Sequence, residues 1–220
     1  IEVFIAEGSN PSAQRNRLGE MATGDYLLFL DDDSIPDKLL LEEYRNVLLH
    51  YPEAKIVGGP SLLIEKNRPL YLMSHLFFSS SFGIGPIKYR YNSIGQIKNA
   101  SEKDLILCNL LIKKDFFMRT KKFNPALFPG EENEFLKRIY THAQILYAPK
   151  AIVYREPRET LNLFIKQMFS YGQGRSKHFK LSTRLELLFL IPLLFSIYLL
   201  SLPLSVKISF FSLTHLVLYL

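Results

Sequence analysis

The chain has 220 residues, enough for one sizeable domain with a packed core plus smaller appendages. Its single cysteine, Cys108, excludes an internal disulfide framework and a cysteine-based zinc site. With 27 lysines and arginines against 21 acidic residues, the formal net charge is +6, which suits nucleic acid, anionic lipid or nucleotide phosphates without choosing among them.

The chain opens with an apolar stretch at residues 1–5 that has the pattern of a strand inside a sheet. Because no methionine or signal-peptide pattern precedes it, we expect the sequence to be a fragment that lacks the N-terminal strands of its domain. Turn-forming residues follow at 7–11. Ser12 is then expected to cap a helix that ends near Met21.

A continuous apolar run at residues 26–30 leads into three consecutive aspartates, Asp31, Asp32 and Asp33. Such a run favours a strand buried on both faces, as in a parallel sheet. The aspartates then lie at the carboxyl end of the strand, where open α/β sheets bind ligands. Because side chains alternate along an extended chain, we expect Asp31 and Asp33 to face one ligand while Asp32 points away.

Two carboxylates on one side of the chain form a half-site for Mg²⁺ or Mn²⁺, which a substrate phosphate would complete. The alternative is that the acids only cap a helix that begins at Pro36 or Asp37. Capping needs one acid, however, whereas three adjacent carboxylates repel one another. The cluster therefore favours a site for a cation or a nucleotide.

The rest of the first 157 residues alternates between apolar strands and helical patterns, as in an α/β domain. We expect a helix from Pro36 or Asp37 to Pro52, a strand at 55–60, a short helix near 70–78 within an irregular region, a strand at 105–112, and one or two short strands at 147–154. Between the strand at 105–112 and the strands at 147–154, we expect another helix that begins with Glu131, Glu132 and Glu134. These acids either stabilise the helix dipole or act in a functional site.

The C-terminal part has the pattern of a membrane-attached segment. Apolar residues recur at helical spacing from Leu161 to Phe169, and basic residues follow, among them Arg175 and Arg184. Residues 187–206 form an apolar run long enough to span a bilayer, and a second apolar run occupies residues 208–220. The alternatives are a helix that packs on the first domain and a buried apolar hairpin. Basic residues beside a span mark its cytoplasmic side.

Several short segments occur in a characteristic order along the chain. They are Ser12-Ala13-Gln14-Arg15-Asn16, Ala22-Thr23-Gly24-Asp25, Phe29-Leu30-Asp31-Asp32-Asp33, Asn109 ahead of Lys113-Lys114, Phe128-Pro129-Gly130-Glu131-Glu132 with Leu136 and Arg138, and Tyr171-Gly172-Gln173-Gly174-Arg175. In this order the segments resemble the family 2 glycosyltransferases, which are inverting GT-A enzymes that use nucleotide-activated sugars. The last segment, ahead of apolar runs, is similar to that of membrane-attached members that build bacterial exopolysaccharides.

The resemblance implies a fold class and a set of site residues. The fold would be α/β, a GT-A catalytic domain with a Rossmann-like mixed sheet at residues 1–158, followed by an interface segment at 159–184 and transmembrane helices at 185–220. Asp33 and Asp31 would bind a divalent cation, Mg²⁺ or Mn²⁺, and Asp31 would also contact the nucleotide. The proposed donor contacts are Arg15, Asn16 and Arg175. The base would be Glu132, with Glu131 or Glu134 as the alternatives because the family usually has Asp there.

The implied activity is transfer of a sugar from a nucleotide-diphosphate donor to a hydroxyl of a lipid-linked or saccharide acceptor. The chain has no Trp and thus lacks the Gln-x-x-Arg-Trp segment of processive synthases. Expected partners are the donor, the acceptor and membrane lipids, but not nucleic acid, since basic residues cluster at the membrane boundary. The expected location is a membrane, the bacterial inner membrane, with the catalytic domain in the cytoplasm. The alternatives are a metal-dependent nucleotidyl- or phosphotransferase and a non-catalytic membrane scaffold.

Overall fold

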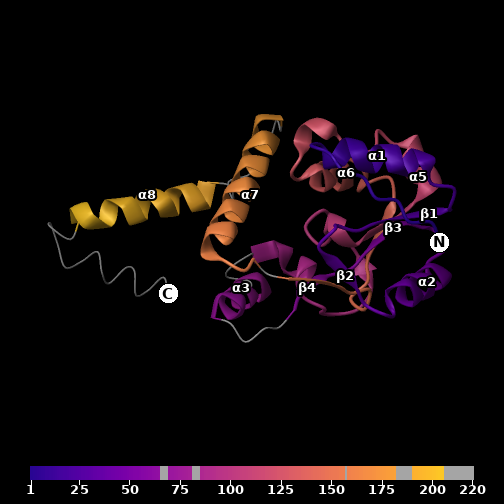
Figure 1. Ribbon diagram of the computed structural model, residues 1–220, viewed down its shortest axis with the longest axis horizontal. Helices are drawn as coiled ribbons and strands as arrows, with labels where there is room; N and C mark the ends of the chain where they lie inside the picture. The colour runs from indigo at the N-terminus through magenta and orange to yellow at the C-terminus, as the bar shows by residue number, and fades with distance from the viewer. Residues whose placement is uncertain (65–68, 81–84, 157, 182–189, 206–220) are drawn as a thin grey trace. The chain divides into compact units, whose positions relative to one another are not determined.

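The computed structural model describes residues 1–64, 69–80, 85–156, 158–181 and 190–205 (Figure 1). The chain divides into two compact units, residues 1–178 and residues 179–220. Every described strand belongs to the first unit.

The helices and strands alternate along the first unit, as the sequence predicted. In chain order the elements are α1 (Pro11–Met21), β1 (Tyr26–Phe29), β2 (Ser34–Pro36), α2 (Leu40–His50), β3 (Ala54–Gly58), β4 (Ser61–Leu63), α3 (Pro69–Ser79), a 3₁₀ segment (Gly85–Arg90), β5 (Lys98–Asn99), a 3₁₀ turn (Leu107–Asn109), β6 (Leu110–Lys113), α5 (Lys114–Arg119), a 3₁₀ turn (Pro125–Leu127), α6 (Glu131–Ile139), β7 (Gln144–Tyr147), β8 (Val153–Arg155), α7 (Leu161–Leu181) and α8 (Leu190–Ser205).

The larger sheet has five strands in the order β1-β6-β3-β7-β5. It is mixed, because β3 and β7 are parallel while β1 pairs antiparallel with β6, with Phe29 opposite Leu110. The expectation of a parallel neighbour for the strand before the aspartates was therefore wrong. The expected burial of this strand on both faces is confirmed, since Leu27 and Phe29 pack into one core and Leu28 packs against the other.

The two cores lie on opposite faces of this sheet. Ile56, Ile112 and Ile145 belong to the core that also contains side chains from α5 and α6, whereas their neighbours in sequence belong to the core that contains α2 side chains. Figure 1 shows α1, α5 and α6 on one side of the sheet and α2 on the other. Alternate side chains of the inner strands thus face opposite cores, which explains their continuous apolar sequences.

A second, three-stranded sheet has the order β2-β8-β4. β2 runs antiparallel to β8, and Ser34 is paired with Arg155. Pro36 is the last residue of β2 and does not begin a helix, so that expectation was wrong. The helix begins at Leu40, after a turn in which the Asp37 carboxylate accepts a hydrogen bond from Leu39 N at 2.9 Å. This small sheet brings the residues after β1 next to the end of β8.

Two expectations for the N-terminal part also need correction. Residues 1–5 form no strand, and Ile1, Val3 and Ile5 are exposed, because their backbone pairs with no described strand. Helix α1 is capped by Asn10, whose Oδ1 accepts a hydrogen bond from Ala13 N at 3.1 Å. Ser12 lies inside the first turn instead, since Pro11 takes the first helical position that proline favours.

The described residues include only part of the expected membrane segment, since 182–189 and 206–220 lie outside them. Within the described ranges, no helix combines the length and apolar character needed to cross a bilayer. Helix α8 has 16 residues and covers only part of the expected span at 187–206. The apolar run at 208–220 lies outside the described residues. In α7, two residues of the expected apolar face, Ile165 and Phe169, are exposed.

Candidate active site

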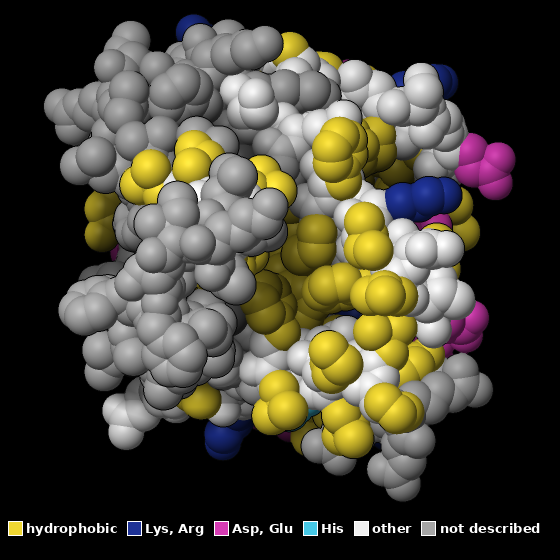
Figure 2. Space-filling model, turned by 90° about the vertical axis from the view of Figure 1, so that its left-hand side faces the viewer, with side chains coloured by type: hydrophobic (Ala, Val, Ile, Leu, Met, Phe, Trp, Pro, Cys, Tyr) yellow, Lys and Arg dark blue, Asp and Glu magenta, His cyan; other side chains and the backbone are white. Residues whose placement is uncertain are grey.

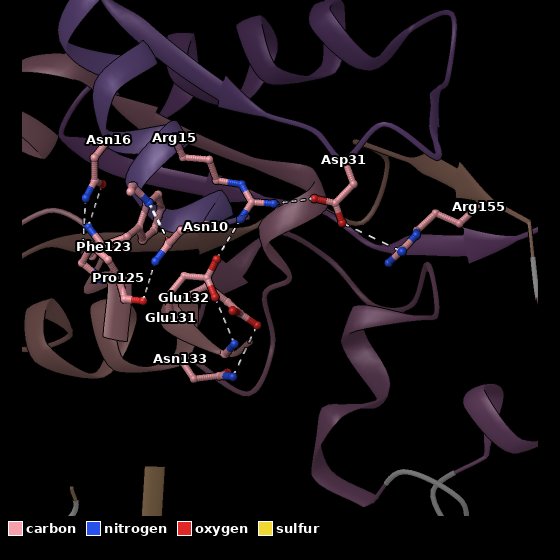
Figure 3. Close-up of polar contacts among 12 residues, drawn as sticks. Asn10, Arg15, Asn16, Asp31, Phe123, Pro125, Glu131, Glu132, Asn133 and Arg155 are labelled. Carbon is pink, nitrogen blue, oxygen red and sulfur yellow. Dashed lines mark hydrogen bonds and ion pairs between the residues drawn. The ribbon is translucent and has the colours of Figure 1, made fainter. Parts of the chain in front are cut away.

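Arg15 joins two of the predicted segments. Its Nη2 lies 2.8 Å from Oδ1 of Asp31, and its Nη1 lies 2.7 Å from Oε1 of Glu131 (Figure 3). Helix α1 supplies the arginine, the segment after β1 supplies Asp31, and the first turn of α6 supplies Glu131. A single guanidinium therefore binds two acids that are 100 residues apart in the sequence. Arginine can do this because, unlike lysine, it presents hydrogen-bond donors on two sides of a planar group.

Glu131 is a buried anchor at the start of α6. Only 1% of the residue is exposed, and its Oε2 accepts a hydrogen bond from the backbone N of Gly130 at 3.0 Å. Gly130 has φ 111°, a left-handed conformation that glycine adopts without a steric penalty. With one oxygen bound by Arg15 and the other by this backbone group, both carboxylate oxygens of Glu131 already have partners.

Glu132 lies beside Glu131 but has different partners. Its Oε1 is 3.6 Å from Nη1 of Arg90 and accepts a hydrogen bond from Asn133 Nδ2 at 3.3 Å. Burial raises the pKa of the Glu132 carboxyl, whereas the charge of Arg90 opposes this rise. A largely buried carboxylate with a raised pKa has the properties of a general base.

Arg90 is a member of this group that sequence reasoning missed. It is buried at the end of the 3₁₀ segment, and its Nε donates a hydrogen bond to Lys103 O at 3.3 Å. Its Nη2 donates to Glu102 O and to the Asn133 side chain. The residue falls in the region that was expected to be irregular, where nothing in the local pattern separates a buried arginine from a surface one.

Asp31 and Asp33 share a side, as expected, but the chain that carries them turns and is not extended, since Ser34 N donates a hydrogen bond to Asp31 O at 3.0 Å. Nη2 of Arg155 is 3.0 Å from Oδ2 of Asp33 and 3.9 Å from Oδ2 of Asp31, whereas Asp32 is exposed. Asp33 also lies 3.7 Å from Nη2 of Arg158. Its second oxygen, Oδ1, is buried and has no hydrogen-bond partner among the described residues. Asp31 and Asp33 therefore face a common partner, which in this structure is a guanidinium.

Comparisons with known proteins show the family and the fold of the chain. Residues 2–120 match the model of glycosyl transferase family 2, which is more than half of the chain. The chain belongs to this family. A search of curated proteins gave no match. Among solved structures, the mannosyltransferase PcManGT from Pyrobaculum calidifontis, in complex with GDP-Man and Mn²⁺, is similar with a TM-score of 0.54 and 14% identity.

The likeness to PcManGT covers 96% of this chain and 59% of that one, so the chain spans less than two thirds of the length of that structure. At this identity the likeness shows the fold, which is the expected mixed α/β fold of the GT-A type. The expected membership of family 2 is confirmed. The membrane-attached type and the status of the sequence as a fragment stay predictions.

Two further residues of this family 2 protein, Asn16 and Arg175, were expected to contact the donor. Asn16 Nδ2 donates a hydrogen bond to Phe123 O at 2.8 Å, and its Oδ1 accepts one from Phe123 N at 3.1 Å. Its amide holds the backbone around Phe123, and its contact with the nucleotide stays a prediction. The Arg175 side chain lies outside the described residues.

Arg155 and Arg158, which face Asp33, were also missed. Arg155 is the last residue of β8, and the register places it opposite Ser34, next to the aspartates. The sequence did contain a hint of Arg155, because the residue comes at the carboxyl end of an expected strand, and open α/β sheets bind ligands at the carboxyl ends of their strands. The sequence could not reveal that β2 and β8 are neighbours.

The carboxylates fit a divalent cation only as part of a larger ligand set. No group of three acidic, histidine or cysteine side chains that could hold a metal ion occurs in the described part of the chain. Asp31 and Asp33 nevertheless face the same side, and the buried Oδ1 of Asp33 has no protein partner there. Mg²⁺ and Mn²⁺ sites built from one or two carboxylates are commonly completed by substrate phosphates.

Proposed function

We propose that this family 2 protein is an inverting glycosyltransferase that moves a sugar from a nucleotide-diphosphate donor to an acceptor hydroxyl. The observation that carries the proposal is the pair of contacts from Arg15 to Asp31 and to Glu131. These contacts hold the aspartates after β1 next to the glutamates at the start of α6. A reaction with a departing diphosphate on one side and an attacking hydroxyl on the other needs these two acidic groups together.

Asp33 and Asp31 are the residues that would hold the divalent cation. When bound, Mg²⁺ or Mn²⁺ would supply positive charge that stabilises the departing nucleoside diphosphate. Three arginines, Arg15, Arg155 and Arg158, contact these aspartates and present further positive charge to the same place. Arginine pairs well with phosphate oxygens, so we assign these side chains to the diphosphate.

Glu132 is the proposed base. It would accept the proton of the acceptor hydroxyl as that oxygen attacks the anomeric carbon, and a single displacement of this kind inverts the anomeric configuration. The raised pKa of Glu132 makes its carboxylate a stronger proton acceptor than an exposed one. Glu131 is less suited to this role, because both of its oxygens are already bound. We assign it to positioning Arg15.

The acceptor and the cellular location are part of the same proposal. The apolar runs at 187–206 and 208–220 and the basic residues before them support attachment to a membrane. On that basis we propose a lipid-linked or saccharide acceptor, and a catalytic domain on the cytoplasmic face of a bacterial inner membrane. Nucleic acid is not a proposed partner.

The test is a donor screen with the full-length protein and Mn²⁺ or Mg²⁺, followed by NMR analysis of the anomeric configuration of the product. With an active donor, Glu132→Gln and Asp33→Ala should each lower kcat by about 10²–10⁴-fold, the range typical for loss of a general base or an electrostatic partner. Asp115→Ala is the matched control, since this carboxylate is exposed on α5. A retained configuration, or full activity in both site variants, would refute the mechanism.

A further inference from the structure

Helix α3 exposes the face on which most of its apolar side chains lie. Tyr71, Ser74 and Phe78 are buried and follow one another at the spacing of a single helix face. The opposite face carries four large apolar residues with exposed fractions of 40% to 66%, namely Leu72, Met73, Leu76 and Phe77. The outer face of a surface helix is ordinarily polar, so this one is suited to contact with an apolar partner.

Helix α7 lies beside α3 and carries a second exposed apolar row. The two helices line one pocket together, α3 through Phe78 and α7 through Phe164 (Figure 1). Along α7, Leu161, Ile165 and Phe169 recur at every fourth residue and are exposed. Figure 2 views the molecule from the side on which α3 and α7 lie and shows hydrophobic side chains gathered there. Two neighbouring helices of the first unit therefore each expose an apolar row.

The charges of these helices favour an anionic partner. Helix α3 contains no aspartate, glutamate, lysine or arginine, and residues 161–184 contain no acidic residue. The basic residues of that segment are Lys166, Arg175, Lys177, Lys180 and Arg184. Lys166 is exposed and adjoins Ile165 in the sequence. Apolar and basic residues without acids suit an anionic lipid surface, because the apolar side chains enter the acyl boundary while the cations stay at the phosphates.

The length of α3 determines how it can contact a bilayer. The helix has 11 residues. At a rise of about 1.5 Å per residue it is about 16 Å long, roughly half of the hydrocarbon core of a bilayer. A helix of this length does not cross the core. It can lie in the plane of the interface, where the apolar face of such a helix reaches about 5–10 Å into the headgroup and acyl boundary.

We propose that α3 and residues 161–169 of α7 lie on the surface of a lipid bilayer that contains anionic phospholipids. The domain that holds the acidic cluster then contacts the membrane directly. This inference rests on the membrane attachment under the proposed function, and goes beyond it by adding a second contact in the first unit, far in sequence from residues 187–220. It does not depend on glycosyl transfer.

Fluorescent labels can test this contact in the full chain. The single cysteine, Cys108, is buried, so a cysteine introduced at an exposed position takes up a thiol label selectively. Leu76→Cys places the label on α3 and Ile165→Cys places it on α7. Leu49→Cys on α2 is the matched control, because Leu49 and Leu76 have similar exposed fractions of 68% and 66%. Unaltered protein gives the background labelling of Cys108.

The labelled chains are reconstituted, without donor or metal, into vesicles of phosphatidylcholine and phosphatidylglycerol that contain a lipid with a quencher on its acyl chain. The labels at positions 76 and 165 should lose most of their emission, whereas the label at 49 should keep it. A quencher near the headgroup should act more strongly than one at the chain end, since interfacial helices lie about 5–10 Å deep. Equal quenching at 76 and 49, or stronger quenching from the bilayer centre, would overturn the proposal.

Other occupants of this surface would give different results. A second copy of the chain, or the apolar run at 208–220, would shield the label at position 76 from iodide in the water without bringing it to the lipid quencher, and this result would overturn the proposal. Vesicles of phosphatidylcholine alone test the charge. The label at 165 should be quenched less in them than in the anionic vesicles, and equal quenching would overturn the choice of an anionic surface.

These measurements are independent of turnover. If the labels are quenched as expected but no donor is used, the membrane contact stands and the glycosyltransferase mechanism falls. If sugar is transferred while the label at position 76 is not quenched, the mechanism stands and the membrane contact falls.

Discussion

Arg90 and Glu132 form a charge pair between the 3₁₀ segment and α6, with Nη1 of the arginine 3.6 Å from Oε1 of the glutamate. The other guanidinium nitrogens of Arg90 donate to the backbone of Glu102 and Lys103 and to the Asn133 side chain. The arginine is thus fixed independently of Glu132. Its charge faces the proposed base from a rigid support, along with the charges of Glu131 and Arg15.

Loss of the Arg90 charge should move the pH dependence of transfer. Burial raises the pKa of Glu132 and Arg90 lowers it, so Arg90→Gln should raise this pKa further. A general base acts in its deprotonated form, and the acidic limb of the kcat/KM profile should therefore shift to higher pH. Arg90→Lys keeps the charge and should restore part of the shift. A uniform loss of activity with an unmoved profile would mean that Arg90 has only a structural role.

The Arg15–Glu131 contact should contribute to stability as well as to the site. In Arg15→Gln the buried Glu131 carboxylate loses its cation, which should lower the free energy of unfolding by about 1–3 kcal/mol. Adding Glu131→Gln removes the unpaired charge, so the double variant should be less destabilised than the two single changes added together. Urea unfolding at pH 7 measures this cycle. Strict additivity would show that the two residues are not coupled.

Local patterns predicted the parts of the site that depend on one segment. The pattern after β1 predicted that Asp31 and Asp33 share one side and that Asp32 points away, although a turn closed by Ser34 N and Asp31 O, and not an extended chain, produces this placement. The acids at the start of α6 were likewise found from helix-start chemistry. These features need no knowledge of which segments become neighbours.

The parts that the sequence did not reveal all depend on contacts between distant segments. The antiparallel pairing of β1 with β6 is one example, because an apolar strand has the same composition in either orientation. Arg155 is another, since only the pairing of β2 with β8 brings it to the aspartates. The hydrogen bonds between Asn16 and the backbone of Phe123, 107 residues away, are a third example.

Transfer should depend on a divalent cation bound through Asp33. Treatment with EDTA should abolish activity, and added Mn²⁺ or Mg²⁺ should restore it. Asp33→Asn keeps the shape of the side chain but weakens cation binding, so this variant should need a higher metal concentration for half-maximal rate. Asp32→Asn is the matched control, because Asp32 is exposed and should keep the wild-type metal dependence. The reverse order of effects in the two variants would contradict the assigned ligands.

Asn109 should be the polar residue on which the fold around the site depends most. It is fully buried, and its Nδ2 donates hydrogen bonds to Pro60 O at 3.0 Å and to Ala151 O at 2.7 Å. Its Oδ1 accepts one from the Tyr44 hydroxyl at 2.6 Å. Asn109 thereby ties the chain after β3 to the turn before β8, the strand that carries Arg155.

Asn109→Ala leaves three buried polar groups without this partner, so the free energy of unfolding should fall by about 3 kcal/mol or more. Gly59→Ala should disturb the same junction, because a Cβ there would lie 1.8 Å from Ala151 O. Urea unfolding measures both, with Asn124→Ala as the control, since that side chain only caps an exposed 3₁₀ turn. If Asn109→Ala were no less stable than Asn124→Ala, the junction would not depend on these hydrogen bonds.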